Sequence, residues 1–273
     1  MKTILFLCDH SQAALNAASF LRILAAKTEA KILCGYTYAI KKADEKILAA
    51  PVMDGPPDAP GNGCNFTLLN RGQNTAFHPE IEEIDLSDMD EAKVAEVVNK
   101  NNIWMMVKGI TNGMANAAND SRLNVHTILN KVLCPLLLVP DGWQAKDIER
   151  LVYIADLRYC RIQIVKYLVD IASFFNADVS IAHISAKGLP KMEEKYALSV
   201  FDEVCSKMDY DRIFFNNIKE QDIPRTIDVM VHAMHTDILA IINHRFHFEQ
   251  MMGRYICEQL PAYITVPLLI FPY

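Results

Sequence analysis

The sequence predicts an α/β protein made of two tandem five-stranded parallel sheets with helices on both faces. Two observations predict this fold. Short apolar runs alternate with helical patterns along the chain, which is typical of parallel sheets with right-handed crossovers. The motifs of the first half also recur, in the same order, in the second half. Because 273 residues suit two domains of common size, we predict a first domain over residues 1–143 and a second over residues 144–273.

Each half opens with an apolar run that closes on an aspartate, ILFLCD ending at Asp9 and LVYIAD ending at Asp156. Such runs indicate buried parallel strands whose carboxyl ends carry the aspartate. A helix is predicted after each strand, and Ser11 is a candidate N-cap for the first helix. The second strands begin at Ala30 and Ala177, so this β-α-β segment aligns between the halves without a gap.

The later elements also match between the two halves. Four further elements are predicted in each half. Their starts in the first and second half are Glu80 and Arg212 for the third strands, Asp90 and Ile223 for the connecting helices, Ile103 and Asp237 for the fourth strands, and Cys134 and Val266 for the closing segments. Acidic residues alternate with apolar ones along the first-half third strand, which suits an edge strand protected by charge. Residues 141–149 are the predicted linker.

The halves differ between their second and third strands. Residues 190–208 of the second half have a helical pattern, whereas residues 49–78 of the first half contain four prolines and four glycines. A long helix cannot form across so many prolines. We predict an irregular surface loop there, and a lid over the first half is the alternative.

The bulk composition excludes several classes of protein. Hydrophobic residues make up 51% of the chain, the formal charge is −6 and the pI is near 5.8, with no basic run of the kind that binds nucleic acid. No segment has the roughly 20 apolar residues that span a bilayer. The first apolar run is too short for a signal peptide, so we expect a cytoplasmic protein. Its seven cysteines have irregular spacing, which favours reduced thiols.

An aspartate after the first strand, together with a closing strand that follows a Cys-Pro or Val-Pro pair, resembles the universal stress protein family, twice over. The resemblance implies a Rossmann-like sheet of strand order 3-2-1-4-5 in each unit, and contact between the units through their fifth strands. Many members of this family bind ATP through that aspartate and a G-x2-G-x9-G-(S/T) pattern after strand four. The glycines of such a pattern let backbone amides approach phosphates at a helix N-terminus.

This glycine pattern is degenerate in the first half. Its register gives Gly109, Asn112, Arg122 and Leu123 at the three glycine positions and the hydroxyl position. Gly113 lies one residue away from the second position, and Arg122 could contact a phosphate through its charge. The glycine pattern is therefore incomplete, and ATP is kept as a candidate ligand of the first half.

The second half departs further from the pattern. Asn243 and Phe246 take the first two positions, and Gly253-Arg254 falls three residues too early for the third. Only Asp156 remains in place. We therefore expect weaker nucleotide binding here than in the first half.

Other groupings of polar residues have simpler interpretations. His232 and His235 have helical spacing, as do His244 and His247, but no cysteine or carboxylate set accompanies them, so we expect packed or solvated histidines and no metal. Asp9-His10-Ser11 contains the residue types of a catalytic triad. Adjacent residues point apart along a chain, however, so we assign no catalytic residue.

Three functions remain open. The leading hypothesis is a stress-response binding or signalling module in which the two units pack as a pseudo-dimer and which forms further homodimers, with a protein partner as another candidate. The alternatives are an ATP-binding protein with weak ATPase activity and a purely structural interaction protein, whose apolar closing strands would offer the partner surface. A ligand would lie where the strand order reverses, against a set of candidate residues from both halves: Asp9, His10, Gly109, Asn112, Gly113, Arg122, Asp156, Asn243 and Arg254.

Overall fold

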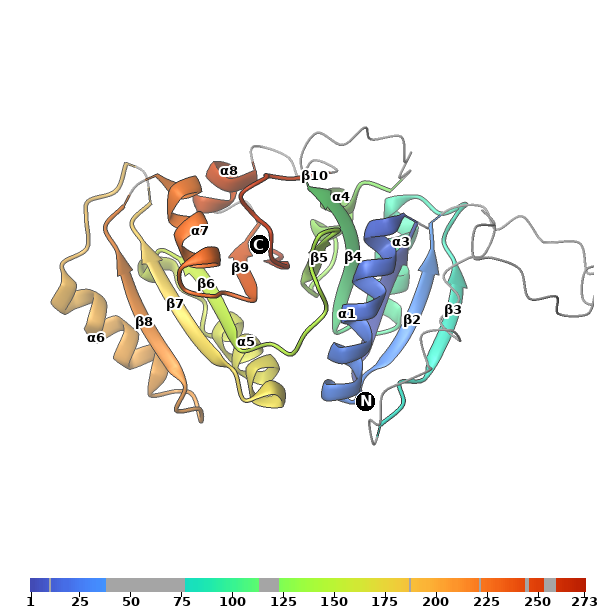
Figure 1. Ribbon diagram of the computed structural model, residues 1–273, viewed down its shortest axis with the longest axis horizontal. Helices are drawn as coiled ribbons and strands as arrows, with labels where there is room; N and C mark the ends of the chain where they lie inside the picture. The colour runs from blue at the N-terminus through green and yellow to red at the C-terminus, as the bar shows by residue number, and fades with distance from the viewer. Residues whose placement is uncertain are drawn as a thin grey trace, which may run out of the picture.

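The computed structural model describes residues 1–9, 11–37, 77–112, 123–186, 188–220, 222–243, 246–252 and 259–273. Figure 1 shows two halves side by side, joined near the middle of the molecule. Most of the predicted loop at residues 49–78 lies outside the described residues.

The helices and strands follow the predicted order in both halves. The first half contains β1 (Thr3–Cys8), α1 (Gln12–Thr28), β2 (Lys31–Tyr36), β3 (Ile81–Asp85), α3 (Glu91–Lys100), β4 (Met105–Asn112), α4 (Val125–Leu129) and β5 (Leu136–Pro140). The second half contains β6 (Arg150–Ala155), the 3₁₀ helix η2 (Leu157–Tyr159), α5 (Ile162–Phe175), β7 (Asp178–Ile184), α6 (Glu194–Cys205), β8 (Ile213–Ile218), α7 (Ile223–His232), β9 (Ile238–Ile242), α8 (Phe246–Met252), β10 (Gln259–Leu260) and β11 (Leu268–Phe271).

The strand order is β3-β2-β1-β4-β5-β11-β9-β6-β7-β8. Each half therefore has the predicted order 3-2-1-4-5, and within each half these strands pair in parallel. The two predicted sheets are joined into one, because β5 and β11 pair with each other in antiparallel orientation. The apolar closing strands are thus occupied inside the chain, so the partner surface that the structural-interaction alternative placed on them is wrong. The acidic β3 lies at one edge of the sheet, as predicted, and β8 lies at the other (Figure 1).

The β5–β11 junction has approximate twofold symmetry. Leu137 pairs with Leu269, and these two residues hold equivalent positions in the matching motifs of the two halves. The flanking pairs join Leu138 to Leu268 and Leu136 to Ile270. All the side chains at this junction are buried. The halves therefore meet as two subunits of an isologous dimer would.

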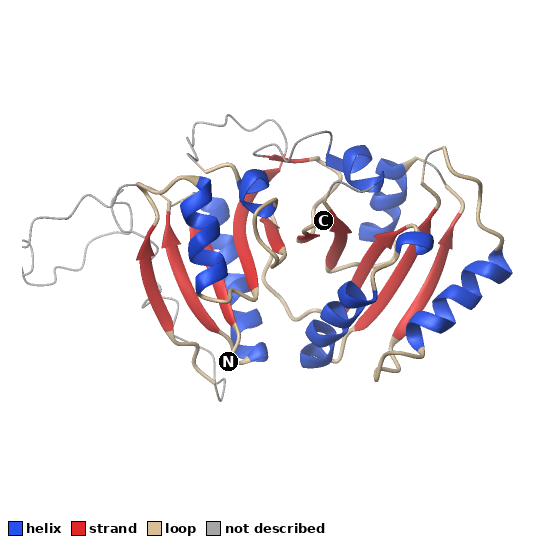
Figure 2. Cartoon of the chain, turned by 180° about the vertical axis from the view of Figure 1, so that it is seen from behind, coloured by secondary structure: helices blue, strands red, loops and turns tan. Residues whose placement is uncertain are grey.

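Helices cover both faces of the sheet (Figure 2). One buried cluster packs α1, α5 and α6 against the strands, and the other packs α3, α4, α7 and α8 against the opposite face. Each cluster contains residues of both halves. The core therefore continues across the junction.

Polar and aromatic contacts reinforce the junction. The Tyr167 hydroxyl donates to the Trp104 carbonyl at 2.8 Å, and the two rings stack with centroids 5.2 Å apart. The Asn243 amide donates to Asn130 Oδ1 at 2.8 Å. In addition, β10 of the second half pairs with the last two residues of β4. Each half thus contacts the carboxyl end of the other half's fourth strand.

The helix ends show local sequence effects. Ser11 caps α1 as predicted, since its Oγ accepts from the Ala14 amide at 3.0 Å. Helices α1 and α5 end at the equivalent residues Glu29 and Asn176, both left-handed with φ of 51° and 55°. The helix predicted from residue 190 begins only at Glu194, four residues after the proline.

The described helices lack the combination of length and apolar character that crossing a membrane requires.

The prediction that His232 and His235 lie on one helix is wrong. Helix α7 ends at His232, and His235 follows it with a positive φ of 52°. His232 instead lies 3.6 Å from the Asp228 carboxylate. Among the described cysteines, all five are free thiols.

Candidate functional site

The strand order reverses once in each half, between β1 and β4 and between β6 and β9. A crevice at the carboxyl ends of such strands is the usual ligand site of an open parallel sheet. Asp9 follows β1 and Asp156 follows β6. We therefore compare the surroundings of these two carboxylates.

Both aspartates close the same kind of turn. Asp9 Oδ1 accepts from the Ser11 amide at 3.0 Å, and Asp156 Oδ1 accepts from the Arg158 amide at 3.1 Å. Short acidic side chains commonly stabilise a turn in this way. Arg158 therefore takes the place in the second half that the capping residue Ser11 takes in the first.

This exchange of serine for arginine neutralises the second carboxylate. The Arg158 guanidinium folds back onto Asp156, with Nε 2.8 Å from Oδ1 and Nη2 2.5 Å from Oδ2. The Ala186 amide donates to Oδ2 at 2.9 Å. Burial raises the pKa of Asp156, but the hydrogen bonds from Arg158 and Ala186 outweigh it and hold the pKa below its usual value. Asp156 is thus an ionised, internally paired carboxylate.

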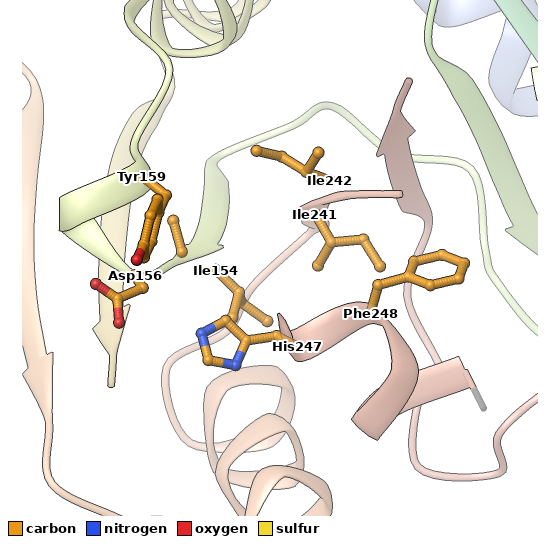
Figure 3. Close-up of a pocket in the computed structure, with 8 residues that line it drawn as sticks. Ile154, Asp156, Tyr159, Ile241, Ile242, His247 and Phe248 are labelled. Atoms are coloured by element: carbon orange, nitrogen blue, oxygen red, sulfur yellow. The ribbon is translucent and has the colours of Figure 1, made fainter. Parts of the chain in front are cut away.

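The second crevice is almost filled. It is lined by Ile154, Ala155, Asp156, Tyr159, Ile241, Ile242, His247 and Phe248. Figure 3 shows Asp156 and Tyr159 on one side and the apolar side chains of Ile241, Ile242 and Phe248 on the other. Its volume is ≈ 20 Å³, enough for about one water molecule, whereas small-molecule sites usually hold about 300 Å³ or more.

Two buried histidines lie beside this crevice. His183 Nδ1 accepts from the Leu157 amide at 3.2 Å, and burial lowers the pKa of His183. His247 Nε2 lies 2.9 Å from the Ile184 carbonyl, and burial lowers the pKa of His247 as well. Because buried imidazoles favour the neutral form, both rings are suited to packing and hydrogen bonding.

Gly109 of the first half has a packing role. A Cβ at Gly109 would lie 2.2 Å from the Ala13 carbonyl oxygen and 2.5 Å from the Ala14 amide nitrogen. The start of α1 therefore rests directly on β4 at this glycine. This contact explains Gly109 without a bound phosphate.

The sheet register corrects the alignment of the second half with this glycine. Gly109 pairs with Val139 in the first half, and Ile242 pairs with Phe271 in the second. Ile242, not Asn243, is therefore the counterpart of Gly109. The Ile242 side chain lines the second crevice, whereas Gly109 has no side chain at the equivalent position of the first half.

The other predicted site residues separate into two groups. His10, Gly113, Arg122 and Arg254 lie outside the described residues. Asn112 ends β4, where it pairs with Leu260 of β10. Asn243 is fully buried and bonds Asn130 across the junction, and it does not line the crevice that contains Asp156.

Within the described part of the chain, no three His, Cys, Asp or Glu side chains lie close enough to hold a metal ion. No cation among the described residues pairs with Asp9, in contrast to Asp156. Sequence reasoning missed Arg158, although aligning the two strands that end in aspartate places it opposite Ser11. It also missed His183, for which no local motif gives a signal.

Comparison with known proteins identifies the fold. No protein-family model and no curated protein matches the sequence. Three solved structures are similar over nearly the whole chain. They are a universal stress protein from Archaeoglobus fulgidus (TM-score 0.61, 9% identity, 98% of this chain and 97% of that one), a Pseudomonas aeruginosa protein assigned to the same group (0.54, 12%, 99% and 93%), and the cytoplasmic domain of a prokaryotic cation chloride cotransporter (0.53, 9%, 99% and 95%).

At these identities the likeness concerns the fold. The chain has the α/β fold of universal stress proteins, with the five-stranded unit present twice. The strand order and the junction through the fifth strands, both implied by the resemblance in sequence, are features of this structure.

Proposed function

We propose that this chain is a cytoplasmic stress-response binding or signalling module of the universal stress protein type, in which the two halves have different roles. Under this proposal a ligand binds in the first half, beside Asp9. The second half is a structural counterpart whose crevice is closed by its own side chains. The observation that carries this proposal is the pairing of Asp156 with Arg158, which has no equivalent among the described residues around Asp9.

Three differences support this division of roles. Asp156 is only 3% exposed and accepts hydrogen bonds on both oxygens, whereas Asp9 is half-buried. Ile242 occupies the second crevice at the position of Gly109. A polar ligand would also have to displace the Arg158 guanidinium, leaving a buried charge without its partner.

The ligand that we would test first is ATP with magnesium. Asp9 follows strand one, as in the nucleotide-binding members that the sequence resembles, and Ser11 opens a long helix beside it. The packing role of Gly109 argues against ATP, because this glycine is explained by its contact with α1 and gives less support to a phosphate-binding glycine pattern. We therefore propose binding as the function and assign no chemical step to any residue.

Calorimetric titration of the full chain with ATP and magnesium tests the division of roles. We expect at most one site per chain, lost in Asp9→Asn and retained in Asp156→Asn. These two variants are a matched pair, because asparagine can still accept the turn hydrogen bond at either position. Two sites, or a single site lost only in Asp156→Asn, would contradict the proposal. No binding in the wild-type chain would favour a protein interaction module that does not use ATP.

A further inference from the structure

The two outer edges of the sheet differ in charge. β3 carries Glu82, Glu83 and Asp85, as expected for an edge that must not pair with another chain. The sequence of β8 is IFFNNI, with no charged residue. Phe214 of β8, the counterpart of Glu82, is 49% exposed. The acidic protection of the first edge is therefore missing from the second.

The backbone of β8 is open on its outer side. The Val179 amide donates to the Arg212 carbonyl, so in this parallel ladder the backbone groups of Phe214 and Asn216 point toward β7. Those of Ile213, Phe215 and Asn217 point outward. Among the described residues no hydrogen bond partner meets these three outward amides. They form a row along β8, which is the outermost strand of the second half (Figure 1).

We propose that β8 pairs in antiparallel orientation with β8 of a second copy of this chain, which extends the sheet across a twofold axis at Phe215. The proposal stands independently of any ligand. An antiparallel pair centred on Phe215 places Ile213 opposite Asn217 of the second copy, so that all three outward residues find partners. The junction of β5 and β11 already uses the same self-complementary geometry inside the chain.

Charge complementarity selects this register. Pairing about Phe215 sets Asp211 of each copy opposite Lys219 of the other, which gives two cross-strand ion pairs. Both residues are exposed, and Lys219 has only a long contact of 3.8 Å to Glu194. Moving the axis two residues toward the N-terminus would set Asp211 opposite Phe215 and leave Lys219 without a strand partner, because Lys207 belongs to the turn after α6. Moving it two residues the other way would leave Lys219 opposite Phe215.

Aromatic side chains add to the pairing. Phe215 stacks on Phe201 of α6 with ring centroids 5.2 Å apart and is only half-buried. The two Phe215 residues would lie directly opposite each other at the axis, and aromatic cross-strand pairs stabilise a sheet. A second copy thus covers apolar surface that the single chain leaves in water.

Sedimentation of the full chain over a range of concentrations tests the proposal. We expect a monomer–dimer equilibrium whose dissociation constant rises about tenfold or more in Lys219→Asp, because two attractive pairs become repulsive. The double variant Asp211→Lys with Lys219→Asp should restore the dimer. Lys93→Asp, which makes the same charge change on the exposed start of α3, is the matched control and should behave as wild type.

Crosslinking with a carbodiimide provides a second readout. Asp211 and Lys219 of one chain flank opposite ends of β8, about 26 Å apart at about 3.3 Å per residue, so a direct bond between them must join two copies. The Glu194–Lys219 contact within one chain serves as the internal control. A monomer at every concentration, a dimer unaffected by Lys219→Asp, a double variant that stays monomeric, or open-ended polymers would each overturn the proposal.

Discussion

The two halves of this chain share strand order, register and the turn that follows the first strand, but the carboxylate in that turn has different surroundings. In the first half Ser11 caps a helix and no described cation pairs with Asp9. In the second half Arg158 occupies the same position, pairs with Asp156, and lies within the 3₁₀ helix η2 that precedes α5. A common backbone plan therefore does not fix the surroundings of this carboxylate. The residue two positions after the aspartate and the residue at the end of the fourth strand both differ between the halves.

The largest expected effect concerns the fourth strand. Gly109→Ala should destabilise the chain by about 3 kcal/mol or more, because the new Cβ would meet the rigid backbone of Ala13 and Ala14. Gly142→Ala is the matched control, since a Cβ there meets nothing within 4 Å. Urea unfolding followed by circular dichroism measures both. Equal stabilities of the two variants would show that α1 does not rest on Gly109.

Replacing Arg158 by serine gives the second half the residue of the first. We expect Arg158→Ser to cost about 2–3 kcal/mol in unfolding free energy, because Asp156 would remain buried without its cation. This loss of unfolding free energy is smaller than the loss expected for a fully buried ion pair, since 24% of the Arg158 side chain is exposed. Lys166→Ser on the exposed side of α5 is the control, and an unchanged unfolding midpoint in Arg158→Ser would remove the basis of the comparison.

The same pair predicts a dependence on pH. Because the folded pKa of Asp156 is lowered, its carboxylate stabilises the fold above the ordinary carboxyl range and loses that contribution as the pH falls through the folded pKa. Asp156→Asn should therefore be less stable than wild type by about 1–2 kcal/mol at pH 7. This difference should shrink below about pH 4. Chemical unfolding at several pH values measures it, and a difference that grows in acid would contradict the assignment.

The smallest expected effect lies at the helix cap of the first half. Ser11→Ala should cost about 1 kcal/mol, because the Ala14 amide loses its acceptor. Ser19→Ala in the middle of the same helix should change stability by about 0.5 kcal/mol or less. The thermal unfolding temperatures of the two variants separate capping from a general effect of removing a hydroxyl. Equal losses would assign Ser11 no special role.

The sequence was sufficient to predict most of the fold. Apolar runs ending at Asp9 and Asp156, and the repeated proline before each closing strand, identified the strands because buried parallel strands need continuous apolar sequence. The contact between the fifth strands followed only from a resemblance, and the joining of the two predicted sheets into one through β5 and β11 was not predicted. Neither strand contains a local signal for the identity of its neighbour. β10 was missed for the same reason, since it forms by pairing with a strand of the other half.

The candidate site was less predictable than the fold. The carboxyl ends of the strands could be located from topology, and Asp156 does line a small crevice there. The pattern of glycines could not distinguish a phosphate-binding role from packing, because both need a missing Cβ, and Gly109 meets the backbone of α1. Sequence spacing also gave the wrong counterpart in the second half. Only the hydrogen-bond register separates Ile242 from Asn243.

The position of β11 also matters for synthesis of the chain. It follows β5 by more than a hundred residues in the sequence, yet it lies between β5 and β9 in the centre of the sheet. While the chain emerges from the ribosome, the outer edge of β5 therefore stays unpaired until β11 has been synthesised. Such edges are prone to pair with other chains during folding. A truncation just before Leu268 should consequently leave the apolar edges of β5 and β9 unpaired. We expect this shortened chain to aggregate more than the full chain.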